Sequence, residues 1–305
     1  VKLAHNKLGS LDESAFATTP NLVGLVLKRN NLSAIKAKLF KNLKVLDWLD
    51  LSGNRLENLP PGVFKSLKKV TNLDLSGNQI TTLANSTFEG LSSLQVLDLS
   101  ANKIETISVK TFRQLKTLAH LSLAMNNLKS LPVGLFSKNS KLDLLILKDN
   151  PNFKIKGSLF SKFSALKTLD LSNCNLTELP EEIFENLHDL QTLFLKKNAL
   201  KTLPEQIFED LFNLEKLDLS DNELDDVDAM PSSLKNLEIL NLENNAIRII
   251  NEGAFSNLIL LEELNLAQNQ IKHIQQLAFV NNYRLRAIDL SRNGYNGQGN
   301  IFKNL

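Results

Sequence analysis

The chain has 305 residues, of which 43% are hydrophobic and 22% are charged, and its 35 Lys and Arg nearly balance its 33 Asp and Glu. This composition predicts a folded chain rather than a disordered one. A net charge of +2 gives no reason to expect nucleic acid or an anionic membrane as a partner. The sequence has no apolar run of about eighteen residues, so it predicts no direct membrane insertion.

A six-residue phrase recurs along the chain. It reads LDLSGN at Leu49–Asn54 and Leu73–Asn78, and LDLSAN at Leu97–Asn102. Carried in both directions, the 24-residue step places Asn, and once Cys, at positions that we call rungs. In chain order the rungs are Asn6, Asn30, Asn54, Asn78, Asn102, Asn126, Asn150, Cys174, Asn198, Asn222, Asn245, Asn269 and Asn293.

The residues around each rung follow the pattern L-x-x-L-x-L-x-x-N-x-L-x-x-L, and most rungs are followed ten residues later by Phe. The L-x-L part predicts a short strand with both leucines on one side and the residue between them on the other. Successive strands should pair in parallel, with the leucines of all turns forming one core. No single turn can bury its own leucines, so stability must be shared between neighbours.

The rung asparagines have a predicted structural task. Where the chain leaves a strand and turns inward, backbone groups become buried, and a carboxamide supplies the donors and the acceptor that they need. Cys174, the one cysteine, occupies such a rung. Cysteine is small and often buried, and the nearest histidine in sequence, His188, lies 14 residues away. We therefore predict a buried core thiol rather than a catalytic nucleophile.

Three turns depart from the rhythm. Asn152 stands beside Pro151 where a Leu is usual, so the backbone should deviate there. After Asn222 the turn is one residue short and lacks its Phe, which predicts that Met230 fills the gap. In the last turn Phe302 comes one residue early.

These motifs resemble the leucine-rich repeat family, over essentially the whole chain. The 24-residue step with its regular Phe resembles the subclass of extracellular animal proteins that includes Toll-like receptor ectodomains, chaoptin-like adhesion proteins and the acid-labile-subunit group. The resemblance implies an α/β fold: a right-handed solenoid, or horseshoe, with a parallel sheet on its concave side. We expect one domain over 1–305, with 12–13 repeats, truncated at both ends and without the cysteine-rich caps of that subclass.

Positions that break the repeat are candidates for a binding surface. The residue between the two strand leucines is usually Asp, expected to be freely solvated, but the sequence has Val26, Ile146 and Phe194 instead. The neighbouring column adds Trp48 and Leu144. An exposed apolar cluster with a charged rim is typical of protein-interaction sites. The predicted ligand-binding residues on the concave face are Leu144, Ile146, Lys148, Phe194, Lys196, Lys197, Trp48 and Val26.

Strand spacing would place Leu144, Ile146 and Phe194 within about 10 Å of one another. The alternative is that these apolar residues pack against each other and bind nothing. Further along, the strand face should be acidic through Glu215, Asp218, Asp221, Glu238, Glu243, Glu262 and Glu263.

Three N-x-S/T sequons, at Asn31, Asn85 and Asn175, are predicted glycosylation sites if the chain is secreted. Asn175 is the weakest of them because it adjoins a rung that we expect to be buried. Glycan occupancy would separate an extracellular protein from an intracellular one.

Catalytic and metal-binding patterns are absent from the sequence. It contains no His/Cys/Asp cluster with zinc spacing, no dense calcium loop, no phosphate-binding glycine loop and no nucleophile elbow. We therefore predict a protein that is not an enzyme and has no metal and no cofactor.

The resemblance implies recognition of a protein ligand or co-receptor, without nucleic acid, and it allows a homodimer. We expect an extracellular receptor ectodomain, Toll-like or related, in immune or developmental signalling. The first alternative is a secreted or membrane-anchored adhesion or carrier protein, and the second is an intracellular scaffold. The sequence downstream of Leu305 would separate receptor from adhesion protein.

Overall fold

The computed structural model describes residues 1–227, 230–297 and 301–302. The chain forms two compact units, Val1–Lys154 and Ile155–Leu305, which we call the first and second units. The expectation of one domain over 1–305 is not tested by this division and stays a prediction.

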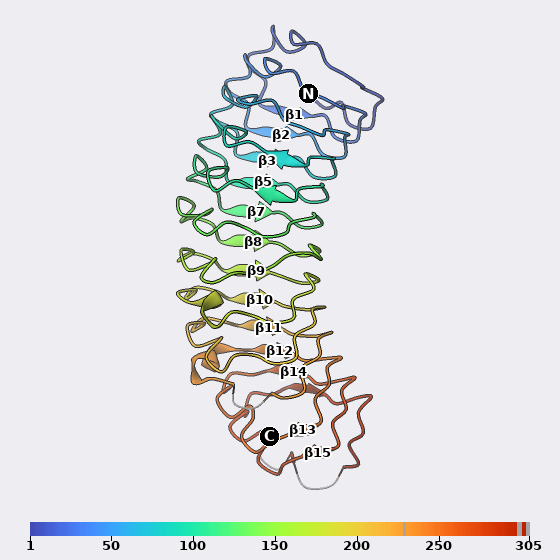
Figure 1. Cartoon of the computed structure of the whole chain (residues 1–305), viewed down its shortest axis with the longest axis vertical. Helices are drawn as coiled ribbons and strands as arrows, with labels where there is room; N and C mark the ends of the chain where they lie inside the picture. Colours follow the sequence, from blue (N-terminus) through green and yellow to red (C-terminus); the bar gives the residue numbers. More distant parts are fainter. Residues whose placement is uncertain (228–229, 298–300, 303–305) are drawn as a thin grey trace. The chain divides into compact units, whose positions relative to one another are not determined.

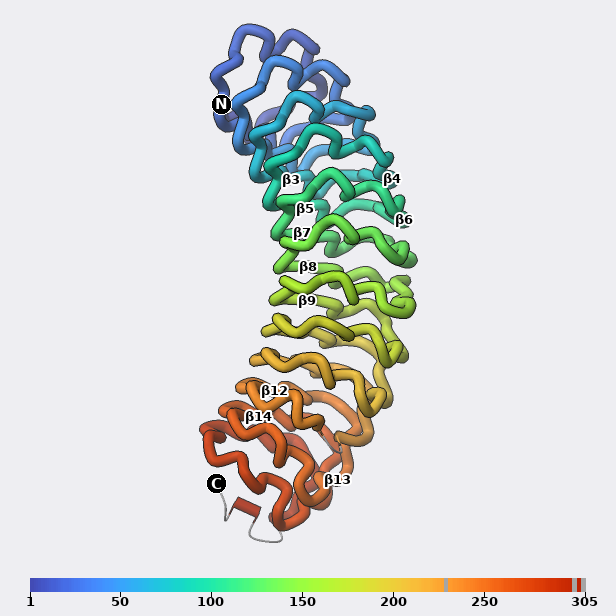
Figure 2. Tube along the Cα trace, turned by 90° about the vertical axis from the view of Figure 1, so that its left-hand side faces the viewer, coloured from blue at the N-terminus to red at the C-terminus, as the bar shows by residue number. Residues whose placement is uncertain are grey.

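The first unit is a stack of coils, each contributing one short strand to a parallel sheet (Figure 1 and Figure 2). The sheet order is β1-β2-β3-β5-β7-β8, and β4 pairs with β6 in a separate two-stranded ribbon. Register follows the repeat, so that Leu25 lies opposite Leu49. The strands are β1 Gly24–Val26, β2 Trp48–Asp50, β3 Asn72–Asp74, β4 Thr82–Leu83, β5 Val96–Asp98, β6 Thr106–Ile107, β7 His120–Ser122 and β8 Leu144–Ile146.

The second unit has the same construction. Its parallel sheet has the order β9-β10-β11-β12-β14-β16, and β13 pairs with β15. The 23-residue step appears in the register as Leu217 opposite Leu240. The elements are β9 Thr168–Asp170, η1 Glu181–Phe184, β10 Thr192–Phe194, β11 Lys216–Asp218, η2 Ser232–Asn236, β12 Ile239–Asn241, β13 Ile249–Ile250, β14 Glu263–Asn265, β15 His273–Ile274 and β16 Ala287–Asp289. Both helices are single 3-10 turns or little longer.

The leucine pattern builds the core as predicted. In the coil around β2, Leu49 and Leu51 are both 0% exposed and point to the interior, while the carboxylate of Asp50 lies on the other side of the sheet. Each fully buried leucine stabilises the fold by about 1.5–3 kcal/mol. That burial requires a coil on each side, so every coil depends on its neighbours.

The rung asparagines inside the stack bond to the backbone of two coils. At Asn102, Nδ2 donates to the carbonyl oxygens of Leu75 and Leu99, both at 3.0 Å, and Oδ1 accepts the N–H of Ile80 at 3.0 Å. The same three bonds recur at Asn54 with Leu27, Leu51 and Leu32. The side chain thus satisfies backbone groups that would otherwise be buried without partners.

Stacked phenylalanine rings, which we call the spine, run through the first unit and form separate stacks in the second, Phe184 with Phe208 and Phe255 with Phe279 and Phe302. In the first unit Phe40, Phe64, Phe88, Phe112 and Phe136 stack with centroid separations between 5.9 and 6.4 Å. Ring stacking at this separation adds to the stabilisation from burial. The rings therefore fix the spacing of the coils on the side of the core away from the sheet.

In the irregular turns, other apolar residues fill the core positions that Leu or Phe occupies in the regular turns. Phe153, one residue later than the usual Leu, is 3% exposed, and its N–H donates to the carbonyl oxygen of Asn150 at 3.0 Å. In the short turn Met230 is 5% exposed. Phe302 stacks on Phe279 at 6.2 Å although it arrives one residue early in the sequence.

One glycine is required by a close approach between coils. Gly90 has φ +96°, and a Cβ there would lie 2.5 Å from the Cα of Lys65 and would clash with its carbonyl oxygen. We expect Gly90→Ala to lower the free energy of unfolding by about 3 kcal/mol, because both the backbone conformation and the contact become unfavourable. Urea denaturation followed by circular dichroism measures the change.

Gly62 provides the matched control, since its φ is +69° but a Cβ there would meet nothing within 4 Å. Gly62→Ala should cost only about 1 kcal/mol from the left-handed backbone. Equal losses in the two variants would show that the contact with Lys65 is unimportant.

Candidate protein-binding site on the strand face

The strand face is the side of each sheet away from the leucine core. Its aspartates hold the backbone where each strand ends. Asp50 Oδ1 accepts the Ser52 N–H at 3.0 Å and the Ser52 hydroxyl at 2.6 Å, and Asp50 is only 5% exposed. This local bond from a carboxylate to the N–H two residues on is a turn-forming arrangement. The expectation that these aspartates are freely solvated is therefore wrong for Asp50.

The pKa values of two of these carboxylates are shifted in opposite directions by their surroundings. Burial raises the pKa of Asp74, and the charges of Asp98 and Asp50 add to the rise, against hydrogen bonds from Ser76. Asp289, in the same motif on β16, is almost fully exposed, and hydrogen bonds from Ser291 lower its pKa. Asp74 lies between Asp50 and Asp98 in the register, so three carboxylates stand side by side on the strand face of the first unit.

The apolar residues of the first unit lie at both ends of its sheet. Trp48 is 49% exposed on β2, and Val26 is half-buried and lies opposite Asp50 in the register. Leu144 and Ile146 are half-buried on β8, the latter opposite Ser122. Lys148, which follows β8, is exposed. These side chains break the aspartate column and are available on the face.

Phe194 on β10 is the apolar break of the second unit. Its register partners on the two neighbouring strands are Asp170 and Asp218, so an aromatic ring stands between two carboxylates. The ammonium of Lys216 lies 5.5 Å from the ring centroid, within the range of a cation–π contact. Sequence reasoning missed Lys216, although it lies one position before a strand leucine and close to Phe194 in the register.

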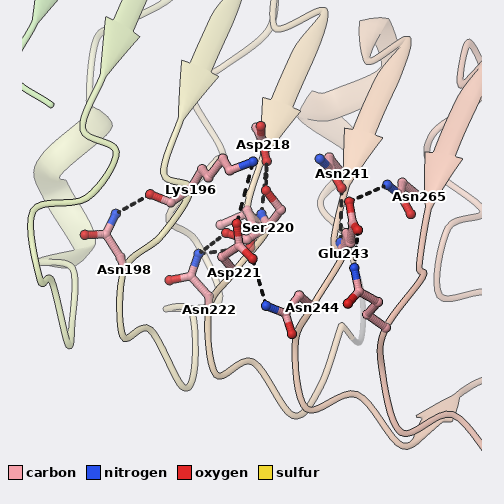
Figure 3. Close-up of polar contacts among 12 residues, drawn as sticks. Lys196, Asn198, Asp218, Ser220, Asp221, Asn222, Asn241, Glu243, Asn244 and Asn265 are labelled. Carbon is pink, nitrogen blue, oxygen red and sulfur yellow. Dashed lines mark hydrogen bonds and ion pairs between the residues drawn. The ribbon is translucent and has the colours of Figure 1, made fainter. Parts of the chain in front are cut away.

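The predicted rim lysines differ in their surroundings. Lys196 is half-buried and its ammonium lies 3.6 Å from Asp221 (Figure 3), whereas Lys197 is exposed with φ +55°. Leu144 and Ile146 belong to the first unit and Phe194 to the second. Their predicted spacing of about 10 Å stays a prediction.

Beyond β10 the strand face of the second unit becomes acidic and amide-rich. Glu243 accepts hydrogen bonds from Asn265 Nδ2 at 3.1 Å and from Gln268 Nε2, and Asn244 Nδ2 donates to Asp221 Oδ1 at 2.7 Å (Figure 3). These bonds hold carboxylates of neighbouring coils in fixed positions. The fixed charges form a surface complementary to basic groups.

A shallow groove of about 500 Å³ crosses this part of the face. It is lined by side chains from β11, β12, β14 and β16. The polar and apolar groups that face it include Lys216, Asp218, Ile239, Asn241, Glu263 and Asn265. The groove was not predicted, because its lining residues come from four strands and meet only through the register between them.

The sequence profile of the family described as "Leucine rich repeat" matches five overlapping or consecutive segments, residues 1–56, 49–104, 93–151, 164–224 and 226–271. A second profile with the same description matches 213–237. The chain belongs to the leucine-rich repeat family. This fold serves protein recognition, which is the broad role that the predicted binding face requires.

Solved structures give the same fold. A chain of the Drosophila Toll–Spatzle complex is 32% identical, with a TM-score of 0.85 over 93% of this chain and 38% of that chain. The present chain therefore spans well under half of that relative. The leucine-rich repeat domain of APL1B (24%, TM-score 0.72, 96% and 82%) and a Leptospira interrogans leucine-rich repeat protein (24%, 0.69, 96% and 84%) share the fold. No curated protein matches the chain.

The sequons of this leucine-rich repeat protein lie at its surface to different degrees. Asn85 and Asn175 are exposed, whereas Asn31 is half-buried. Asn175 is exposed in spite of its buried neighbour Cys174, which is 0% exposed. The backbone at Asn175 is left-handed, with φ +56°. All three sites stay predictions.

Two features are absent from the described residues. No group of three or more histidine, cysteine or acidic side chains among them is arranged to hold a metal ion. None of the described helical segments has the length and apolarity that crossing a bilayer requires.

Proposed function

We propose that this chain is the protein-recognition part of an extracellular receptor of the Toll-like kind, and that it binds a protein ligand or co-receptor through its strand face. The 32% identity to a chain of the Toll–Spatzle complex supports this function, because the two chains align over 93% of this one.

The observation that carries the binding site is Phe194. The fold places Asp or Asn at this position in the coils on either side, and these polar residues bond to the backbone two residues on, as Asp170 and Asp218 do. A half-buried phenylalanine gives up that bond and leaves an aromatic surface on the face. Aromatic side chains beside charged rims are typical anchors of protein interfaces.

The acidic groove of the second unit extends the proposed surface. Its aspartates, glutamates and asparagines would pair with basic and amide groups of a partner, while Phe194 and Lys216 provide the apolar contact next to it. In the first unit, Leu144 and Ile146 offer a second apolar contact.

We expect Phe194→Asp and Ile146→Asp each to weaken binding of the protein ligand by about tenfold or more. The reason is that each removes buried apolar contact area, and Phe194→Asp also sets a third carboxylate beside two others. The test immobilises the chain and measures biolayer interferometry against a panel of secreted proteins that includes Spatzle.

Val133→Asp is the matched control, because Val133 is 65% exposed but lies outside the strands. It should leave binding unchanged. Equal affinity for the unchanged chain and both strand-face variants, with intact circular dichroism spectra, would remove the strand face as the binding site.

A further inference from the structure

The net charge of +2 is the sum of two units that have large net charges of opposite sign. The first unit, residues 1–154, has 21 Lys and Arg against 11 Asp and Glu, a net charge of +10. The second unit has 14 against 22, a net charge of −8. The near balance of the whole chain therefore says nothing about the partners of either unit, and it gives no reason to exclude a polyanionic partner for the first.

The positive charge of the first unit is concentrated on one part of each coil. We call the eighth to fifteenth residues after each rung the outer segment, which contains the spine Phe and lies across the core from the strand. In the first unit the outer segments hold a single acid, Glu89. They hold eleven basic residues, Lys38, Lys41, Lys44, Lys65, Lys68, Lys69, Lys110, Arg113, Lys116, Lys138 and Lys141.

Six of these cations form two columns, which we call the basic flank. The first column has Lys41, Lys65 and Arg113, and the second has Lys44, Lys68 and Lys116. The residues of a column occupy equivalent positions of their coils, and each column is interrupted once, the first by Glu89 and the second by Ser92. All six side chains are exposed.

A repeated backbone turn gives the basic flank a fixed geometry. In its coil the Lys41 N–H donates to the Lys38 carbonyl, and the Lys44 N–H donates to the Asn42 carbonyl, both at 3.0 Å. The Arg113 and Lys116 N–H groups make the equivalent bonds in their own coil. The buried spine rings beside these turns are spaced about 6 Å apart, so the turns of adjacent coils stand at regular intervals.

Among the described residues, one cation of the basic flank is paired with an acid of its own unit, whereas the second column is not paired. Lys65 pairs with Glu89 at 3.3 Å. In the part of the chain that the structure describes, Lys44, Lys68 and Lys116 make no ion pair. Six of the eleven acids of the first unit lie instead on or beside the strand face, namely Asp47, Asp50, Asp74, Asp98, Asp143 and Asp149.

The second unit shows that the fold does not require this charge. Its outer segments hold four basic residues against five acids. The positions equivalent to Lys41 and Lys44 are occupied there by Glu185 and His188 in one coil and by Glu209 and Phe212 in the next. The same turns thus carry acidic residues in the second unit at positions where the first unit has basic residues.

We propose that the basic flank of the first unit binds a sulfated polysaccharide, a ligand and a surface separate from the protein-recognition face. Exposed ammonium and guanidinium groups on regularly spaced turns complement a chain molecule that carries sulfate and carboxylate groups at regular intervals. Ten of the eleven cations are lysines, which act as point charges and lack the bidentate fork that favours arginine at nucleic-acid phosphates.

Two further absences favour a polysaccharide over other polyanions. Within the described residues, the outer segments of the first unit expose no large apolar side chain and no aromatic ring, because their phenylalanines are buried. Single-stranded nucleic acid binding uses aromatic rings for stacking, and stable attachment to a lipid surface uses inserted apolar groups. The basic flank offers charge alone.

The test is binding to immobilised heparin as a function of salt. The variant replaces Lys44, Lys68 and Lys116 with serine, the residue found at this position in Ser92 and Ser140, so the fold should accept it. We expect affinity at about 0.15 M salt to fall about tenfold or more, and the slope of log Kd against log salt to decrease by about 2. Circular dichroism should be unchanged, and Lys→Arg at the same three positions should retain binding.

The matched control replaces Lys103, Lys129 and Lys148 with serine, the same loss of charge elsewhere on the first unit. An equal loss in this control would show that only net charge matters and would overturn the proposal. So would equal binding to desulfated heparin, or tighter binding to duplex DNA or to phosphatidylserine vesicles than to heparin. Phe194→Asp should keep heparin affinity, so failure here and failure of the proposed protein binding are separate results.

Discussion

Replacing Phe88 with alanine is expected to lower the free energy of unfolding by about 4 kcal/mol. Its ring is 1% exposed and stacks on Phe64 at 6.4 Å and on Phe112 at 5.9 Å, so the substitution empties the space between two neighbouring coils. The adjacent coils cannot close the gap, because strand pairing and the rung bonds hold their separation. Urea denaturation followed by circular dichroism measures the loss.

Phe212→Ala is the control for this prediction. Phe212 is 44% exposed and its ring contacts His188 at a centroid distance of 5.5 Å, so its removal leaves no closed cavity. We expect a loss of about 1 kcal/mol. Similar losses in the two variants would show that the phenylalanine column does not hold the coils together.

The coils, the core and the spine could be predicted from the sequence because the same pattern of apolar residues recurs in coil after coil. Leu49 and Leu51 are buried, as are the equivalent leucines of the other coils. Because Cys174 stands where the other coils have a buried Asn, its burial could be predicted from its position in the repeat. Met230 could also be placed, because the short turn has one apolar residue near the missing ring.

The roles of individual polar residues were harder to predict. Asp50 looked like a solvated surface residue because its neighbours in sequence alternate with buried leucines, yet its carboxylate bonds to the backbone at Ser52. Lys216 and the groove near Ile239 depend on which residues of different coils meet across the register. That juxtaposition follows from the fold and is not visible in one repeat.

Charge was misjudged for a different reason. The net charge of the whole chain contains no information on where the charged residues lie. The position of a lysine such as Lys68 within the repeat decides whether it lies next to other lysines. Equivalent positions of successive coils carry the basic flank in the sequence itself, so the flank could have been predicted without the structure.

Replacing Asn102 with alanine is expected to lower the free energy of unfolding by about 4 kcal/mol. The variant leaves the carbonyl groups of Leu75 and Leu99 and the N–H of Ile80 without the side chain that bonds to them. Each buried polar group without a partner costs about 1–3 kcal/mol, and a water that enters the space left by the carboxamide offsets part of the total. The urea midpoint by circular dichroism again gives the measurement.

Two variants determine whether the hydrogen bonds cause that loss. Asn102→Cys should cost clearly less than Asn102→Ala, since the rung Cys174 is fully buried and its Sγ donates to the Ser172 carbonyl at 3.5 Å. Asn127→Ala removes an exposed asparagine next to the rung Asn126 and should change stability by less than about 0.5 kcal/mol. If Asn102→Ala were as harmless as Asn127→Ala, the backbone groups around the rung would be satisfied without it. The repeated asparagine would then need another explanation.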